Sequence, residues 1–209
     1  MVKSDGAIYF TDPIFGRRAP HGVPREPELG HSSVYRIAPD GALTRLVPRL
    51  EQPNGLCFSL DESLMYVNDS PRKEIHVFPV LPDGSLGEGR LFAHLPGVEP
   101  GVPDGMKVDL DGHVYCCGPG GIHVLTALGQ RIARIRFPEK SCNFAFGDED
   151  HCTLYVTAST SVYRMRVETA GWPQWQAARR RGDFAHVSPG QDASSAMAAS
   201  AAPIQHSGS

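Results

Sequence analysis

The sequence lacks any apolar run of about 18 residues, the length that a membrane-spanning helix needs. It also shows no N-terminal apolar segment of the kind found in secretory signal peptides. The net charge of −3 is too small to indicate nucleic-acid binding, and the single basic cluster, at 179–181, lies near the C-terminus. These absences predict a cytoplasmic protein whose partner is a small molecule, not a nucleic acid or a membrane.

Catalytic signatures of two common enzyme classes are also missing. No Gly-x-Ser-x-Gly sequence supports a serine hydrolase, and no Gly-rich phosphate loop supports a nucleotide enzyme. The cysteines are five, an odd number, and none forms a Cys-x-x-Cys pair. We therefore expect buried, reduced thiols in preference to disulfides or zinc ligands. The cysteines are Cys57, Cys116, Cys117, Cys142 and Cys152.

What the sequence does contain is a repeated strand pattern. A turn residue followed by a β-branched and aromatic run occurs at 5–13, 61–69, 111–117 and 150–157. Each copy precedes a second strand-like segment, at 33–41, 75–84, 121–125 and 161–165. The copies lie roughly 40 to 55 residues apart, the period typical of β-propeller blades. No segment before the C-terminal part keeps a helical period of 3.6 without an interrupting Pro or Gly.

The repeat predicts an all-β chain, a β-propeller of about four blades over residues 1–170. Residues 171–209 show no strand pattern, and their Ala- and Ser-rich end predicts an irregular, disordered C-terminal tail. A long connection at 16–32 interrupts the first blade. A connection of this length is either functional or a surface insertion.

Two corners with the same design carry the candidate site. Asn54 stands between Pro53 and Gly55, and Asp104 stands between Pro103 and Gly105, each just ahead of a strand-like run. Proline fixes φ, and glycine permits a turn or a close backbone approach, so the polar side chain between them is held in place. Two such corners one blade apart predict that Asn54 and Asp104 point at one site. The alternative is that each residue only closes a turn.

Other polar and aromatic residues have structural interpretations of comparable weight. Asn143 begins the inner strand of the next blade, where it either lines the same channel or forms an ordinary strand-end hydrogen bond. His76, His113 and His123 occupy strand or turn positions that favour surface or turn roles over ligation. The tyrosines at one repeat position are predicted to pack in the core. They are Tyr9, Tyr66, Tyr115 and Tyr155.

Several of these segments together resemble the senescence-marker-protein/gluconolactonase family, which includes regucalcin and related six-bladed propeller lactonases. The matching segments follow the order and spacing of that family across most of residues 2–167. They are Asp-Gly-Ala-Ile-Tyr-Phe-Thr-Asp-Pro (5–13), Pro-Asn-Gly-Leu (53–56), Leu-Met-Tyr-Val-Asn-Asp (64–69), Pro-Asp-Gly-Met-Lys-Val-Asp (103–109), Gly-Pro-Gly-Gly-Ile (118–122), Asn-Phe-Ala-Phe-Gly (143–147) and Leu-Tyr-Val-Thr-Ala (154–158).

The resemblance implies a function for the two corners. In the family, the Asn and Asp of these corners bind a divalent cation at the end of the central channel, which corresponds here to Asn54 and Asp104. Amide and carboxylate oxygens are hard ligands that suit Ca²⁺, Mg²⁺ or Mn²⁺, and Zn²⁺ is not excluded. The implied reaction is hydrolysis of a sugar lactone by water, with Asp104 holding the cation and accepting a proton.

The chain also departs from the family pattern. Family members carry about two further blades ahead of the segment that corresponds to residues 2–6, with a metal-binding Glu in a Glu-Gly-Pro sequence and an Asn in an Asn-Asp sequence. Neither occurs in this position here. The expectation is an N-terminally truncated copy. The alternative function is therefore a non-catalytic calcium-binding propeller, or a remnant that lacks the remaining ligands.

Overall fold

The structure, a computed structural model, describes residues 1–19, 21–47 and 49–173. Its regular elements in these residues are β-strands and one short 3-10 helix, η1 (Phe15–Arg17). The strands are β1 (Ile8–Thr11), β2 (Val34–Ile37), β3 (Leu43–Val47), β4 (Pro53–Phe58), β5 (Leu64–Asp69), β6 (Glu74–Pro79), β7 (Arg90–His94), β8 (Met106–Val108), β9 (Val114–Gly118), β10 (Gly121–Leu125), β11 (Arg131–Ile135), β12 (Ser141–Gly147), β13 (Thr153–Ala158) and β14 (Val162–Arg166).

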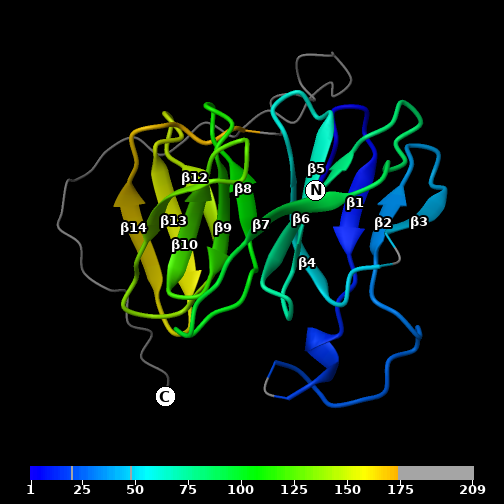
Figure 1. Cartoon of the computed structure of the whole chain (residues 1–209), viewed down its shortest axis with the longest axis horizontal. Coiled ribbons are helices and arrows are strands. Elements are labelled where there is room, and N and C mark those ends of the chain that lie inside the picture. Colours follow the sequence, from blue (N-terminus) through cyan, green and yellow to red (C-terminus); the bar gives the residue numbers. More distant parts are fainter. Residues whose placement is uncertain (20, 48, 174–209) are drawn as a thin grey trace, which may run out of the picture.

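The strands form four antiparallel sheets, each built from strands that are consecutive in the chain (Figure 1). We call these sheets blade 1 (β1–β3), blade 2 (β4–β7), blade 3 (β8–β11) and blade 4 (β12–β14). Consecutive antiparallel pairing is the meander of a propeller blade. The predicted all-β fold with about four blades is confirmed.

The strands at one edge of each blade lie against one another. β1 lies against β4, β4 against β8, and β12 against both β8 and β9. In blade 1, residues 1–3 take the place that β8 has in blade 3. Val2 forms an antiparallel bridge with Ile8, and Val108 pairs in the same way with Val114 in blade 3. The polar corners at the start of β4 and just ahead of β8 are therefore brought to the shared edge of neighbouring blades.

Asp-Gly turns join the strands as their sequence predicts. Gly6 and Gly84 have φ of 89° and 80°, a left-handed conformation that glycine adopts without a Cβ penalty. In each turn the preceding Asp side chain accepts a backbone hydrogen bond two residues on, from Ala7 to Asp5 and from Ser85 to Asp83, both at 2.9 Å. These turns fix the ends of the strands locally.

The core lies in the seams between blades. The aromatic ring of Tyr9 in blade 1 packs edge-on against Phe58 in blade 2, with 5.1 Å between centroids. Tyr66 and Tyr115 are likewise buried, which confirms their predicted packing role. Tyr155 differs, because it is partly exposed and its hydroxyl donates to Asp148 at 2.7 Å. In blade 4 the repeat position therefore forms a surface hydrogen bond.

All five cysteines are free, as the sequence analysis predicts. Cys57, Cys116 and Cys117 are buried, whereas Cys142 and Cys152 are partly exposed. Burial raises the pKa of Cys57 and of Cys117 to about 12. The buried thiols are therefore protonated at neutral pH.

The described chain ends against blade 3. The amide of Leu110 donates to the carbonyl of Ala170 at 2.8 Å, and the amide of Trp172 donates to Val108 at 2.9 Å. Residues 174–209, which make up most of the predicted tail, lie outside the described residues, so the division at 170/171 stays a prediction. Across the part that is described, no helix is long and apolar enough to cross a membrane.

Candidate functional site

Asn54 and Asp104 meet at the seam between blades 2 and 3. Asn54 is the second residue of β4, and Asp104 precedes β8 by two residues. The side-chain amide nitrogen Nδ2 of Asn54 donates to Oδ1 of Asp104 at 3.1 Å. The structure thus brings together the two residues that the sequence singles out, from positions 50 residues apart in the chain.

The glycines of the two corners permit this approach. A Cβ on Gly55 would overlap the carbonyl oxygen of Asp104, and it would lie 3.0 Å from the carbonyl carbon. A Cβ on Gly105 would overlap Oδ1 of Asn143 and lie 2.8 Å from its Cα. Contacts this short do not occur for real side chains, so only glycine fits at both positions. The Asn54 corner therefore rests directly on the Asp104 corner, and the Asp104 corner rests on β12 of blade 4.

Burial and hydrogen bonding act in opposite directions on Asp104. Burial raises the pKa of its carboxyl above the ordinary value, because the ionised form loses solvation. The hydrogen bond from Asn54 and the nearby Lys140 and His21 lower this pKa and partly offset the effect of burial. The net pKa is raised, so an unliganded Asp104 is a stronger base than an exposed aspartate.

The end of strand β5 supplies further contacts that the sequence analysis did not identify. Asn68 donates to the carbonyl of Asp104 at 2.6 Å, and Ser70 donates to the carbonyl of Pro103 at 2.6 Å. Ser70 also accepts a hydrogen bond from Nδ2 of Asn54 at 3.2 Å. The one sequence signal is a polar run, Asn-Asp-Ser, directly after an apolar strand core.

The end of strand β1 and the connection that follows it lie beside the same corners. Thr11 Oγ1 donates to the carbonyl of Asn54 at 2.7 Å, and the amide of Ile14 donates to Oε1 of Gln52 at 3.0 Å. His21, in the same connection, is close enough to Asp104 to affect its pKa. The connection with η1 thus borders the site, at the lower side of Figure 1.

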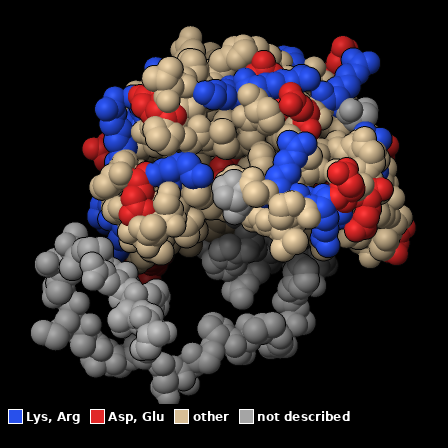
Figure 2. Space-filling view, turned by 90° about the horizontal axis from the view of Figure 1, so that it is seen from below, with Lys and Arg blue, Asp and Glu red and all other residues tan. Residues whose placement is uncertain are grey.

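A cavity of about 620 Å³ lies within this connection, but neither Asn54 nor Asp104 lines it. Its lining residues are Ile14, Arg17, Arg18, Ala19, Pro24, Arg25, Glu26 and Pro27. Figure 2 views the molecule from this side and shows Lys and Arg interspersed with Asp and Glu, without a field of one sign. The chemistry of the site therefore rests on the two corners and not on this cavity.

The Asn54–Asp104 pair suits a hard divalent cation in ligand type. Both residues offer oxygen ligands, and their polar atoms already lie within hydrogen-bond distance. A cation between them would be bound by the amide oxygen of Asn54, which requires the amide to turn its nitrogen away from Asp104. The described residues include no group of three or more His, Cys, Asp or Glu that could hold a metal ion. The pair thus supplies two of the six to eight ligands that Ca²⁺ takes.

The remaining predicted polar residues have local partners. Asn143 lies against Gly105 at the edge of the site, and its Oδ1 accepts a hydrogen bond from the backbone amide of Phe144 at 2.8 Å. The three histidines each form a hydrogen bond within their own blade. These bonds join His76 to Glu74 at 2.9 Å, His113 to Asp109 at 2.9 Å and His123 to the carbonyl of Pro119 at 3.0 Å.

Comparisons with known proteins agree with this architecture. Residues 1–160 match the family model described as the SMP-30/gluconolactonase/LRE-like region. A gluconolactonase of Zymomonas mobilis is 32% identical over 180 residues, which cover 82% of this chain and 50% of that protein. The solved structure of a Xanthomonas campestris gluconolactonase is 40% identical, with a TM-score of 0.71 over 79% of this chain and 55% of that one.

A calcium-binding regucalcin of Agrobacterium tumefaciens is similar as well, with 27% identity and a TM-score of 0.61 over 75% of this chain and 50% of that chain. The chain spans about half the length of the curated relatives it matches.

Proposed function

The chain belongs to the SMP-30/gluconolactonase/LRE-like family, and on this basis we propose that it acts in divalent-cation-dependent hydrolysis of sugar lactones. The observation that carries the proposal is the contact of Asn54 with Asp104 at 3.1 Å across the seam of two blades. The proposed cation is Ca²⁺, with Zn²⁺, Mg²⁺ and Mn²⁺ as alternatives that the same oxygen ligands accept.

The relatives support the substrate class. The Zymomonas and Xanthomonas proteins are named gluconolactonases, and the Agrobacterium protein is described as calcium-binding. Sequence identity to the Xanthomonas protein is highest among these three, at 40%. Because the chain spans about half of such relatives, their activity is proposed for it and not assigned to it.

In the proposed mechanism, Asn54 and Asp104 would hold the cation through their side-chain oxygens. When bound, the cation supplies a positive charge that polarises the lactone carbonyl and stabilises the developing oxyanion. Asp104 accepts the proton of the water that attacks this carbonyl. The C–O bond of the ring then breaks, and the ring oxygen leaves as the hydroxyl of the product acid when it takes that proton back from Asp104.

The environment of Asp104 bears on this role in two ways. Burial raises the pKa of Asp104 and so makes its carboxylate a better proton acceptor. A bound cation lowers the pKa of the same group, because it stabilises the ionised form. The proposed double role therefore requires that Asp104 bind the cation through one oxygen and receive the proton on the other.

A second candidate function is non-catalytic cation binding. It is favoured by the small number of ligands, since the described residues contain no cluster of three His, Cys, Asp or Glu. A site with few ligands and little negative charge binds cations more weakly. This candidate keeps Asn54 and Asp104 as ligands but predicts no turnover.

Hydrolysis assays on the purified full chain separate the two candidates. Acid release from D-glucono-1,5-lactone is followed by pH-stat titration after removal of metal, with Ca²⁺, Zn²⁺, Mg²⁺ or Mn²⁺ then added back and the spontaneous rate subtracted. We expect metal-dependent turnover that Asp104→Ala abolishes. Asp40→Ala is the control, because Asp40 accepts the amide of Ala42 in an exposed turn of blade 1, at 3.0 Å. Cation binding without turnover would favour the second candidate, and full activity of Asp104→Ala would refute the site.

A further inference from the structure

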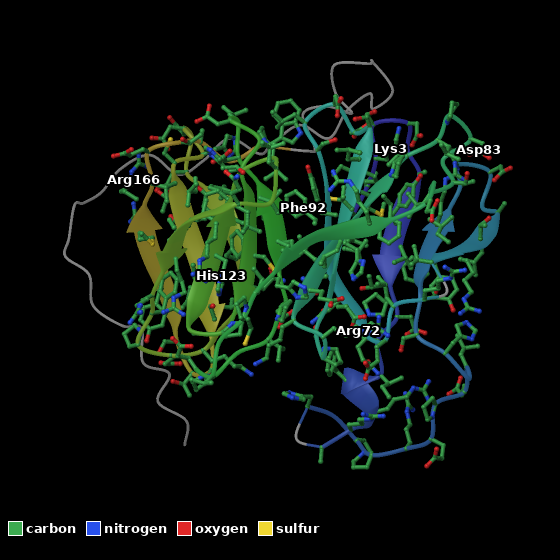
Figure 3. The ribbon with its side chains drawn as sticks, viewed as in Figure 1. Lys3, Arg72, Asp83, Phe92, His123 and Arg166 are labelled. Atoms are coloured by element: carbon green, nitrogen blue, oxygen red, sulfur yellow. The ribbon has the colours of Figure 1, made fainter. Side chains whose placement is uncertain are left out.

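Three consecutive polar side chains at the end of β5 are buried. Asn68 and Asp69 are 0% exposed, and Ser70 is 1% exposed. Buried polar groups are costly unless they form hydrogen bonds, so each of these side chains must have partners. Figure 3 labels Arg72, two residues beyond Ser70, at the lower side of the molecule near η1. The end of β5 therefore lies on the same side as the candidate site.

Ser70 connects both corners. Its hydroxyl donates to the carbonyl of Pro103 at 2.6 Å and accepts from Nδ2 of Asn54 at 3.2 Å. A hydroxyl has one donor and two acceptor positions, and these two bonds use one of each. Ser70 thus fixes the Asn54 side chain relative to the peptide that precedes Asp104.

Asn68 connects the same corners through the backbone. Its Nδ2 donates to the carbonyl of Asp104 at 2.6 Å, and its Oδ1 accepts the amide of Gly55 at 3.2 Å. The carbonyls of Pro103 and Asp104, on either side of the Asp104 Cα, are therefore both held by blade 2, through Ser70 directly after β5 and Asn68 near the end of β5. This arrangement limits rotation of the Asp104 backbone relative to Asn54.

Asp69 completes the support within blade 2 alone. Its carboxylate accepts the amides of Glu51 at 2.8 Å and Gln52 at 3.1 Å, just ahead of Asn54. Unlike its two neighbours, Asp69 has no contact with the Asp104 corner among these hydrogen bonds. Of these three buried side chains, Asn68 and Ser70 are the two that link blade 2 to the Asp104 corner.

We propose that Asn68 and Ser70 are positioning residues that set the separation and orientation of Asn54 and Asp104 for cation binding. The inference rests on the proposed function, because it concerns the same site. Outer partners of metal ligands typically contribute about 10- to 100-fold to metal affinity when they hold the ligands in place. A role confined to satisfying buried polar groups would instead change stability and leave the cation affinity of the folded protein unchanged.

Ser70→Ala in the full chain tests the proposal against a matched control. The control is Ser33→Ala, because Ser33 is equally buried and its hydroxyl also donates to a backbone carbonyl at 2.6 Å, that of Val47 within blade 1. Calorimetric titration with Ca²⁺ and Mn²⁺ should show affinity reduced about 10- to 100-fold in Ser70→Ala and retained in Ser33→Ala. Ser70→Thr, which keeps the hydroxyl, should recover part of the affinity. Parent-like affinity in a folded Ser70→Ala protein, or an equal loss in Ser33→Ala, would overturn the proposal.

A second measurement keeps the inference separate from the proposed function. If the parent chain binds none of the four cations, the proposed function fails at its cation site. Crystal structures of the parent and Ser70→Ala proteins then compare the Asn54 side chain directly. We expect it to leave Asp104 in the variant. An unchanged Asn54 rotamer with its 3.1 Å contact to Asp104 would refute the positioning role, whatever the cation result.

Discussion

Gly55→Ala should separate the two corners of the candidate site. A Cβ on Gly55 would overlap the carbonyl oxygen of Asp104 and lie 2.7 Å from Nδ2 of Asn68. Ordinary van der Waals contact begins at 3.4 Å, so the side-chain amide of Asn68 must move by the difference of about 0.7 Å, in addition to any movement at Asp104. The backbone carbonyl of Asp104 cannot rotate away as a flexible side chain does. We therefore expect the seam between blades 2 and 3 to open at this point.

The energetic effect has two parts. Overpacking of a tight site costs about 1–3 kcal/mol, and loss of the 2.6 Å hydrogen bond from Asn68 to Asp104 costs about 0.5–1.5 kcal/mol. The free energy of unfolding should thus fall by roughly 2–4 kcal/mol, which for a chain of this size lowers Tm by on the order of 5–15 °C. Cation affinity should fall in parallel, because Asn54 and Asp104 no longer face each other at the same separation.

Urea unfolding and calorimetric cation titration measure both effects on the full chain. Gly30→Ala is the matched control, because a Cβ at Gly30 meets nothing within 4 Å and its φ is not in the left-handed region. This control should be as stable as the parent. Equal stability of Gly55→Ala and Gly30→Ala, with unchanged cation affinity in both, would refute the close-contact argument.

Three further predictions concern residues outside the two corners themselves. Ellman's reagent at pH 8 should modify only Cys142 and Cys152 rapidly in the native chain and all five thiols in denaturant, because the other three are buried; fast reaction of five thiols in native buffer would contradict the structure. Hydrogen bonds, first that from Ser161, lower the pKa of Glu139 to about 2. Glu139→Gln should therefore lower the urea midpoint of unfolding at neutral pH. The difference between the midpoints of variant and parent should shrink as pH falls from 4.5 toward 2, and a pH-independent difference would disprove this role of the Glu139 carboxylate. Asp69→Ala should lower the free energy of unfolding by about 3 kcal/mol in urea titrations, because two backbone amides, those of Glu51 and the buried Gln52, lose a charged acceptor; a loss below about 1 kcal/mol would show that other groups replace it.

Part of the fold was predictable because its causes are local. Strand identity follows from alternating β-branched and aromatic residues, and the turns follow from Asp-Gly pairs whose glycines take φ near 80–90°, as Gly6 and Gly84 do. Repetition of that pattern predicted about four propeller blades, and the structure confirms them as four antiparallel sheets. Tyr155 shows the limit, because the same repeat position is buried in blades 1 to 3 and partly exposed in blade 4. Burial depends on what the next sheet covers, and no local pattern contains that information.

The candidate site likewise has a part that the sequence determines and a part that depends on the tertiary structure. By itself, the sequence determined the two Pro-flanked corners, because proline and glycine restrict the backbone at Asn54 and Asp104 wherever these residues lie. Only the tertiary structure decided that the two side chains meet, and that Asn68 and Ser70, at and just beyond the end of β5, hold both corners. Those hydrogen bonds join residues 33 to 50 positions apart in the chain. The acceptors for Asn68 and Ser70 are backbone carbonyls, which every residue carries, so only the packing of one blade on the next selects them.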